Sequence, residues 1–153
     1  MRNSAHRPVS QTGIWIDHSR AIVVEIAADD TVHTRTLKSD LERTTKPQGG
    51  AHGGIGEHVV TGANLRRLAE RRRNALRTFY RSVWGALPSE GDLVVLGPSL
   101  APKELIRNAP RHGNTAARLR AILRLGTVTD GELLARVREF FGRDAPRRQA
   151  MAH

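Results

Sequence analysis

The sequence predicts an α/β protein built on a single mixed five-stranded sheet with helices packed on it. Near the amino terminus, three short apolar or alternating segments at 13–17, 21–27 and 31–37 are separated by turn residues, as in an antiparallel meander. After residue 62, helical and strand-like segments alternate. The order is therefore βββ–loop–αβαβα, in which three antiparallel strands come first.

The first two strands are apolar and the third alternates. The sequences GIWID (13–17) and AIVVEIA (21–27) are typical of buried strands, whereas TVHTRTL (31–37) predicts a strand with one solvated face. Between the first two strands, Asp17 begins a tight turn in which its carboxylate is expected to accept hydrogen bonds from nearby backbone amides.

A long helix is predicted from residue 63 to about residue 86, where Gly85 and Pro88 end it. Its apolar residues share one face that we expect to pack on the sheet, namely Leu65, Leu68, Ala69, Leu76, Phe79, Tyr80 and Val83. Its other face carries six arginines, Arg66, Arg67, Arg71, Arg73, Arg77 and Arg81. Arg72 falls within the apolar face, so it must pair with a carboxylate or extend to solvent.

The remaining elements follow the long helix. Residues 92–97 form a continuous apolar strand, typical of one buried on both faces, and 101–110 form a short helix ended by a proline. Residues 118–126 fit either a strand or a helix, and we take the later part as a strand. Thr129 and Glu132 then form a capping box that begins the last helix.

These elements fit one domain. At 153 residues the chain is long enough to bury a core, which we place at 13–142. Residues 1–12 are expected to be a disordered leader, and 143–153 a basic disordered tail. The glycine-rich stretch at 38–62 has no apolar periodicity, and a loop of this length indicates either function or disorder.

Composition excludes several classes of site. The chain has no cysteine, so disulfides and cysteine-ligated metal sites are ruled out. We see no secretory signal, no apolar run long enough to span a bilayer, and no helix with a broad lipid-facing stripe. We therefore expect a cytoplasmic protein without a membrane partner.

The net charge of +10 is placed unevenly along the chain. Residues 1–62 carry seven Lys/Arg and seven Asp/Glu, whereas residues 63–153 carry eighteen and eight, so the whole excess lies in the second part. Such asymmetry indicates an anionic partner, most often nucleic acid. The alternative is a merely solvated arginine face, but such faces usually mix in glutamate, and here Glu70 stands nearly alone.

The glycine-rich loop does not match a standard phosphate-binding motif, because neither a Walker A sequence nor a Gly-x-Gly-x-x-Gly after a strand is present. Its glycines would let backbone amides approach RNA phosphates closely. The loop residues that we single out are Gln48, Gly49, Gly50, His52, Gly53 and Gly54. A flexible insertion that contacts nothing remains an alternative.

No catalytic or metal-binding constellation is predicted. A two-metal nuclease of the ribonuclease H-like kind needs converging carboxylates, but Asp17 ends its strand and Asp92 begins its strand. If these strands are parallel, the two carboxylates lie at opposite ends of the sheet. The histidines lack metal-ligand spacing, and no serine or cysteine nucleophile is recognisable, so we expect neither metal nor cofactor.

Several motifs together resemble a known family. They are GIWIDHSRAIVVEI with its Trp-Ile-Asp-His turn, LVVLGPSLAPKELI with a Gly-Pro turn before a lysine-bearing helix, and the closing TDGELLARVREFF. Over about 13–142 the chain resembles the middle domain of archaeal and eukaryotic class I peptide chain release factors and of Pelota. It is more similar still to the short bacterial translational machinery proteins related to that domain.

This resemblance implies a release-factor middle-domain-like fold and a role at the ribosome. In the release factors, the loop before the long helix carries a Gly-Gly-Gln tripeptide that promotes peptidyl-tRNA hydrolysis. Here the loop reads Pro-Gln-Gly-Gly-Ala-His-Gly-Gly, with Gln48 before its glycines, so peptide release does not carry over. Pelota also lacks the tripeptide, so ribosome binding remains open.

The sequence therefore predicts a non-catalytic RNA-binding protein of the translation machinery that binds ribosomal RNA, tRNA or the ribosome. The six arginines would contact phosphates, and the glycine-rich loop would become ordered on docking. One alternative is a peptidyl-tRNA hydrolase or rescue factor in which Gln48 or His52 positions water. Another is a protein–protein interaction module that does not bind RNA.

Overall fold

The computed structural model describes residues 10–41 and 62–142, and its elements follow the predicted order with one addition. The addition is a four-residue helix, α4, in a segment that we expected to be a loop. The elements are β1 (Gln11–Ile16), β2 (Arg20–Ile26), β3 (Val32–Lys38), α2 (Gly62–Gly85), β4 (Asp92–Gly97), α3 (Ala101–Arg107), α4 (Thr115–Arg118), β5 (Leu119–Arg124) and α5 (Asp130–Phe141).

The strands form one mixed sheet in the order β3-β2-β1-β4-β5, which confirms the predicted fold class. β2 is antiparallel to both β1 and β3, whereas β4 is parallel to both β1 and β5. The turn between β1 and β2 has the predicted chemistry, since Oδ1 of Asp17 accepts hydrogen bonds of 2.8 Å from the amides of Ser19 and Arg20. That turn keeps the first hairpin short.

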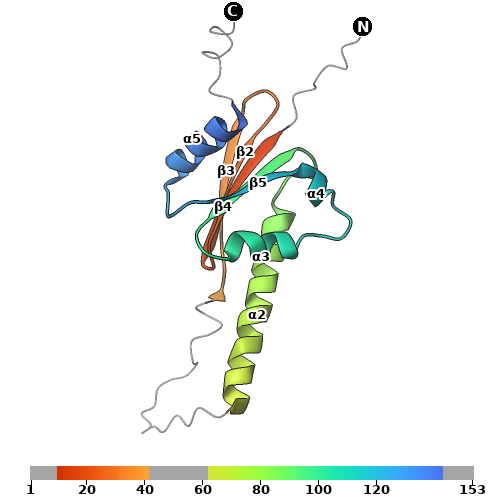
Figure 1. Cartoon of the computed structure of the whole chain (residues 1–153), viewed down its shortest axis with the longest axis vertical. Helices are drawn as coiled ribbons and strands as arrows, with labels where there is room; N and C mark the ends of the chain where they lie inside the picture. Colours follow the sequence, from red (N-terminus) through yellow and green to blue (C-terminus); the bar gives the residue numbers. More distant parts are fainter. Residues whose placement is uncertain (1–9, 42–61, 143–153) are drawn as a thin grey trace, which may run out of the picture.

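Helices cover both faces of the sheet (Figure 1). On one face, α2 and α3 pack over inward-facing residues of β1, β2 and β4. The largest members of this cluster are Phe79, Tyr80 and Trp84 of α2. On the opposite face, α5 packs Leu133 and Val137 over Trp15 and its neighbours. Because β4 lies between two strands and under helices on both faces, its residues 93–96 are buried, as predicted.

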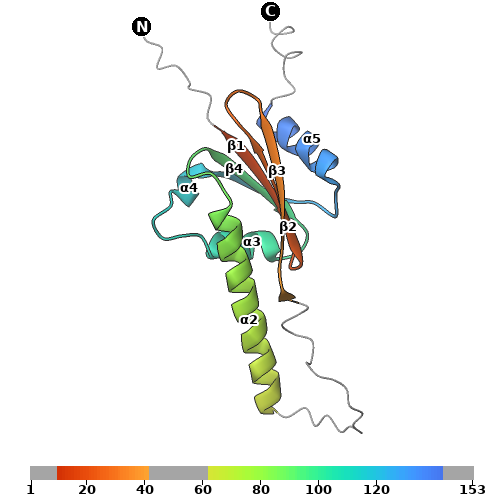
Figure 2. The same cartoon turned by 180° about the vertical axis from the view of Figure 1, so that it is seen from behind.

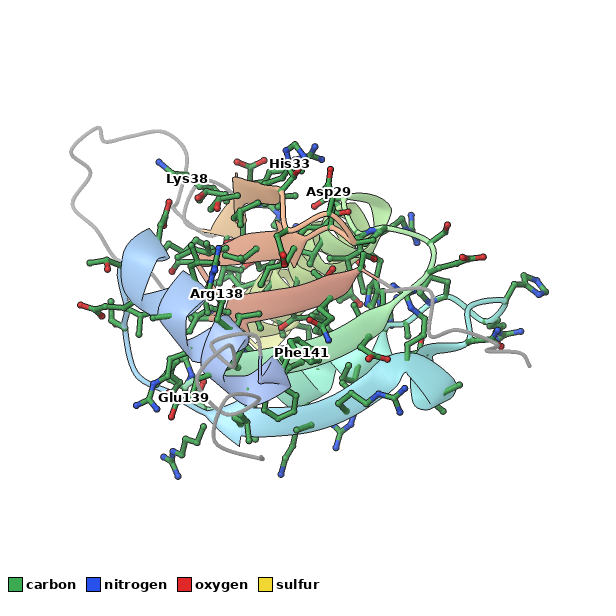
Figure 3. The ribbon with its side chains drawn as sticks, turned by 90° about the horizontal axis from the view of Figure 1, so that it is seen from above. Asp29, His33, Lys38, Arg138, Glu139 and Phe141 are labelled. Carbon is green, nitrogen blue, oxygen red and sulfur yellow. The ribbon has the colours of Figure 1, made fainter. Side chains whose placement is uncertain are left out.

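α5 begins with a capping box and approaches the sheet closely at a glycine. The predicted box is present. The Thr129 side chain accepts a hydrogen bond from the backbone amide of Glu132, and the Glu132 carboxylate accepts one from the backbone amide of Thr129. A Cβ on Gly13 of β1 would lie 2.1 Å from Cγ2 of Val137, so only glycine permits this approach of α5. Figure 3 shows Arg138 and Phe141 on the helix as it crosses this face.

Several predicted boundaries are wrong by a few residues. The expected leader, 1–12, overlaps the fold, because β1 begins at Gln11 and Thr12 is fully buried. Both ends of the expected loop, 38–62, belong to regular elements, because Lys38 lies in β3 and Gly62 lies in α2. Backbone pairing and the burial of Leu41 extend ordered structure past the strand.

β3 also differs from its prediction. Only its ends pack on the fold, with Val32 against the α5 side and Leu37 against the α2 side, so neither face of the strand is uniformly buried. Asp29, His33 and Lys38 lie along this edge of the sheet, away from α5 (Figure 3). The reason is that β3 is an edge strand beyond the cover of the helices.

The main correction concerns α2. We expected its whole apolar face to pack on the sheet, but every residue from 62 to 74 is exposed and burial begins at Leu76. Leu65 is 55% exposed and Leu68 is 41% exposed. Figures 1 and 2 show why, because the first half of the helix extends away from the sheet and the other helices. We call residues 62–74 the projecting half of α2.

Candidate nucleic-acid interface

The six predicted arginines of α2 are all exposed, but the helix directs them to different sides. Arg73, Arg77 and Arg81 are spaced by four residues and therefore form one row along the helix. Arg66 lies two turns before Arg73 and continues this row. Arg67 and Arg71, also four residues apart, form a second row. The single face predicted from the sequence is thus two rows with different surroundings.

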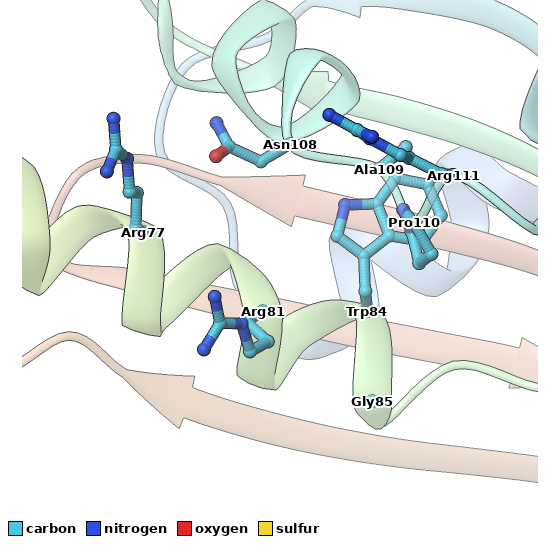
Figure 4. A pocket seen from close by; sticks show the side chains of 8 residues that line it. All are labelled: Arg77, Arg81, Trp84, Gly85, Asn108, Ala109, Pro110 and Arg111. Carbon is cyan, nitrogen blue, oxygen red and sulfur yellow. The ribbon is translucent and has the colours of Figure 1, made fainter.

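The end of the first row reaches a pocket of about 490 Å³ between α2 and the segment that follows α3. Arg77 and Arg81 line it from α2 and Arg111 from beyond α3 (Figure 4). Trp84, Ala109 and Pro110 supply an apolar wall. Three guanidinium groups from two segments therefore surround one cavity with an apolar side.

A second pocket, of about 540 Å³, lies next to the first and shares Arg77 and Asn108 with it. Its lining adds Arg72 and Arg73 from α2 and Arg107 from α3. We call the two adjoining pockets together the arginine groove. The groove therefore collects the arginines Arg72, Arg73, Arg77, Arg81, Arg107 and Arg111.

The second row faces another part of the molecule. Arg71 lines a shallow hollow on the opposite side of α2 with Lys38, Ser39 and Asp40, which follow from the end of β3. Arg67 lies one turn earlier in the projecting half and is exposed. The hollow is more mixed in charge than the groove, because Asp40 is part of its lining.

The arginine groove has one carboxylate, and that carboxylate is already engaged. Glu104 of α3 accepts a hydrogen bond of 2.6 Å from the hydroxyl of Tyr80, and its same oxygen lies 3.2 Å from Nε2 of His18. Burial, and then the hydrogen bond to Glu104, raise the pKa of Tyr80. Tyr80 therefore stays a neutral donor, and its hydrogen bond and the contact with His18 both engage the same oxygen of Glu104.

The described arginines of α2 have no carboxylate partner within the structure. Over residues 10–41 and 62–142, the ion pairs join His18 to Glu104, Arg120 to Asp92 and Arg136 to Glu139. Arg72, which we expected to pair or to reach solvent, does the latter, since it is exposed. Like charges gathered with few counter-charges repel one another, and an anion bound among them relieves that repulsion.

Sequence reasoning missed three members of the groove. Arg72 was assigned to the apolar face, and Arg107 and Arg111 lie in a segment that gave no binding signal of its own. Only packing of α3 beside α2 brings these side chains to the row of Arg73, Arg77 and Arg81. The basic residues around the proline at the end of the predicted short helix are visible in the sequence, but nothing in the sequence places them beside α2.

The structure describes only some of the residues that we considered for catalysis. Asp17 follows β1 and Asp92 begins the parallel β4, so the two lie at opposite ends of the sheet, as predicted. Within the part of the chain that the structure describes, no three His, Asp or Glu residues are placed to hold a metal ion. The loop residues Gln48, Gly49, Gly50, His52, Gly53 and Gly54 lie outside the described residues.

In the described parts of the chain, no helix is long and apolar enough to cross a membrane.

No protein-family model and no curated protein matched the sequence. Several solved structures are similar to it, among them the following two. One is an archaeal translation termination factor, aRF1, with 9% identity and a TM-score of 0.47 over 77% of this chain and 30% of that one. The other is the Thermoplasma acidophilum Pelota protein, with 13% identity and a TM-score of 0.41 over 84% of this chain and 32% of that one. The chain thus spans about a third of their length.

Proposed function

We propose that this chain is a non-catalytic RNA-binding protein of the translation machinery, and that α2 and the arginine groove hold the phosphate backbone of ribosomal RNA or tRNA. The observation that carries the proposal is the gathering of arginines from α2, α3 and the segment after α3, none of which forms an ion pair within the described residues. Guanidinium groups bind phosphate through paired, charge-assisted hydrogen bonds, which makes a phosphate polymer the best-matched partner.

The projecting half of α2 supports a polymeric partner over a small anion. Its thirteen residues extend about 20 Å at the rise of an α-helix and are exposed around the whole circumference. Arg66, Arg67 and Arg71 are therefore accessible from more than one side. An extended arginine-bearing rod suits an RNA surface, where phosphates lie on several sides of a cleft. Such contacts fix position and carry little sequence information.

Translation enters the proposal through the sequence motifs that resemble the release-factor middle domain and Pelota. The absence of a Gly-Gly-Gln tripeptide from the sequence supports binding without peptide release. We further propose that the glycine-rich loop before α2 becomes ordered only when the protein docks on its RNA. The rival enzyme, a peptidyl-tRNA hydrolase using Gln48 or His52, is tested by incubation with ribosomes that carry peptidyl-tRNA. Ester cleavage that Gln48→Ala or His52→Ala abolishes would replace our proposal.

Ribosome co-sedimentation tests the RNA-binding role directly. We expect the triple variant Arg66→Glu, Arg67→Glu, Arg71→Glu to lose co-sedimentation at moderate salt without a lower Tm, because all three side chains are exposed. The matched control reverses three exposed arginines elsewhere, Arg35→Glu, Arg124→Glu and Arg136→Glu, and so changes the net charge equally. We expect this control to retain most of the binding, because its charges lie on β3, β5 and α5.

Two results would contradict the proposal. Unchanged co-sedimentation of the α2 variant at moderate salt would show that these arginines do not contact RNA. An equal loss in both variants would show that only the net charge matters. Wild-type binding should also weaken steeply as salt rises, with a slope that becomes shallower when phosphate contacts are removed. Capture of a protein partner independent of salt would favour the interaction-module alternative.

A further inference from the structure

We propose that the first pocket of the arginine groove binds a single unpaired nucleotide. Arg77, Arg81 and Arg111 would hold its phosphate, and its base would lie against the apolar wall of Trp84, Ala109 and Pro110 (Figure 4). This inference deepens the proposed function, on which it rests, because it names single-stranded RNA as the class of ligand for this part of the surface.

The pocket has the size and mixed lining that a nucleotide needs. Its volume of about 490 Å³ lies within the usual range for small-ligand pockets. A phosphate alone requires only the cationic side, whereas this cavity also presents an indole, a proline ring and a methyl group. The combination of cationic and flat apolar surfaces matches a ligand that has a phosphate at one end and an aromatic base at the other.

The cationic side of the pocket comes from two chain segments. Arg77 and Arg81 lie on successive turns of α2, whereas Arg111 lies more than twenty residues further along the chain, beyond α3. None of the three forms an ion pair within the described residues. Because their charges repel one another across the cavity, the site gains most from a ligand that carries negative charge.

The apolar wall is held rigidly. Nε1 of Trp84 donates a hydrogen bond of 2.9 Å to the carbonyl oxygen of Leu105, and the indole packs in the core with only 8% of its surface exposed. Asn108, on the same rim, is fixed by a 2.8 Å hydrogen bond from its side-chain amide to the carbonyl oxygen of Glu104. A wall that is already ordered costs little entropy on binding.

The arrangement favours an unpaired nucleotide over one in a duplex. In an A-form helix, each base is stacked and paired, so it cannot reach a pocket beside its own phosphate, whereas an unpaired base can turn outward. The second pocket continues from the first at Arg77 and Asn108 and adds Arg72, Arg73 and Arg107. It therefore provides cations for the next phosphate of a strand that runs along the groove between α2 and α3.

Binding of two RNA probes to the full chain tests this inference. The probes are a short single-stranded oligouridylate and an RNA duplex of equal length, and the test variant is Arg111→Gln. The matched control is Arg35→Gln, which also removes one exposed arginine but lies on β3, outside α2 and the groove. We expect Arg111→Gln to weaken binding of the single strand about tenfold, the effect of losing one charge-assisted contact, and Arg35→Gln to weaken it much less. On the duplex the two variants should differ little.

Free uridine 5′-monophosphate shows whether the pocket accepts a free nucleotide or only a nucleotide within an RNA strand. Quenching of tryptophan fluorescence by this nucleotide, reduced in Arg111→Gln, would show that the pocket accepts a free nucleotide. Binding of the oligomer alone, with the same dependence on Arg111, would show that the nucleotide must belong to a strand. Either result supports the pocket, because only Trp84 of the two tryptophans lines it.

The inference is overturned if Arg111→Gln and Arg35→Gln weaken the two RNA probes equally. In that case, the groove is only part of a diffuse cationic surface, and the proposed RNA-binding function still stands. Failure of the wild-type chain to bind either RNA probe at low salt would instead overturn the proposed function. A response to the free nucleotide under those conditions, lost in Arg111→Gln, would leave the pocket as the site of a nucleotide that is not part of RNA.

Discussion

The hydroxyl of Tyr80 in α2 donates a hydrogen bond of 2.6 Å to Oε1 of Glu104 in α3. His18, in the turn after β1, lies 3.2 Å from the same oxygen. One carboxylate thus joins three elements beneath the arginine groove. The bond fixes how α2 and α3 lie beside each other, and that relation in turn decides which arginines share a pocket.

Stability should fall at alkaline pH as a result of this bond. Burial, and then the hydrogen bond to Glu104, raise the pKa of Tyr80 in the folded chain above its ordinary value near 10. The neutral side chain is therefore favoured by folding, and its stabilisation is complete below about pH 10 and lost progressively above it. The slope attributable to this one group is at most about 1.4 kcal/mol per pH unit.

The measurement is direct because Tyr80 is the only tyrosine in the chain. Near-ultraviolet absorbance should show tyrosinate forming together with loss of helical circular dichroism, and not before it. Tyr80→Phe should lower the free energy of unfolding at neutral pH by about 1.5–3 kcal/mol, the range for a hydrogen bond to a charged group. It should also remove this part of the alkaline slope. Ionisation of Tyr80 in the fully folded chain near pH 10 would contradict the prediction.

The close approach of α5 to β1 predicts that Gly13→Ala destabilises the fold. The added methyl would lie 2.1 Å from Cγ2 of Val137, so the helix must shift or the side chain must leave its rotamer. We expect a loss of about 1–3 kcal/mol in the free energy of unfolding, as for other overpacked cores. Chemical denaturation followed by circular dichroism measures it.

A glycine of α5 provides the control. Nothing lies within 4 Å of a Cβ placed on Gly131, so Gly131→Ala should leave stability unchanged or raise it by up to about 1 kcal/mol through helix propensity. The double variant Gly13→Ala, Val137→Ala should be less destabilised than the sum of its single variants, because the second change removes the clash. Strict additivity would show that the two residues do not conflict.

The projecting half of α2 predicts unequal effects for leucines that share one helix face. Leu76→Ala should cost about 2–5 kcal/mol, because Leu76 is buried in the cluster under α2 and α3. Leu65→Ala should change the free energy of unfolding by less than about 0.5 kcal/mol, because Leu65 is 55% exposed. Urea denaturation of the two variants gives both values. A comparable loss in Leu65→Ala would mean that another segment covers this part of the helix.

Local features of the fold could be predicted because their partners are close in sequence. The carboxylate of Asp17 bonds amides two and three residues ahead, and Thr129 and Glu132 complete their capping box within one helical turn. The central strands of the mixed sheet also followed from the sequence, because the apolar runs of β1, β2 and β4 predicted that these strands are buried.

Features that depend on distant packing could not be predicted in this way. The pattern of Leu65 and Leu68 is the same as that of the buried Leu76, yet only the last lies over the sheet. Periodicity shows that residues share a helix face, but it does not show how far the neighbouring sheet extends beneath that face. Arg107 and Arg111 gave no separate signal for the same reason.

The sequence by itself determined the order of the strands and of the helices other than α4, the glycine-rich segment before α2, and the placement of the excess positive charge after residue 62. The tertiary structure alone decided that α2 projects beyond the sheet and that Arg77 and Arg81 face Arg111 across a pocket beside Trp84. The physical reason is the distance along the chain between the interacting residues. Hydrogen bonding and periodicity act within a few residues, whereas a pocket forms only where packing brings side chains from separate segments together.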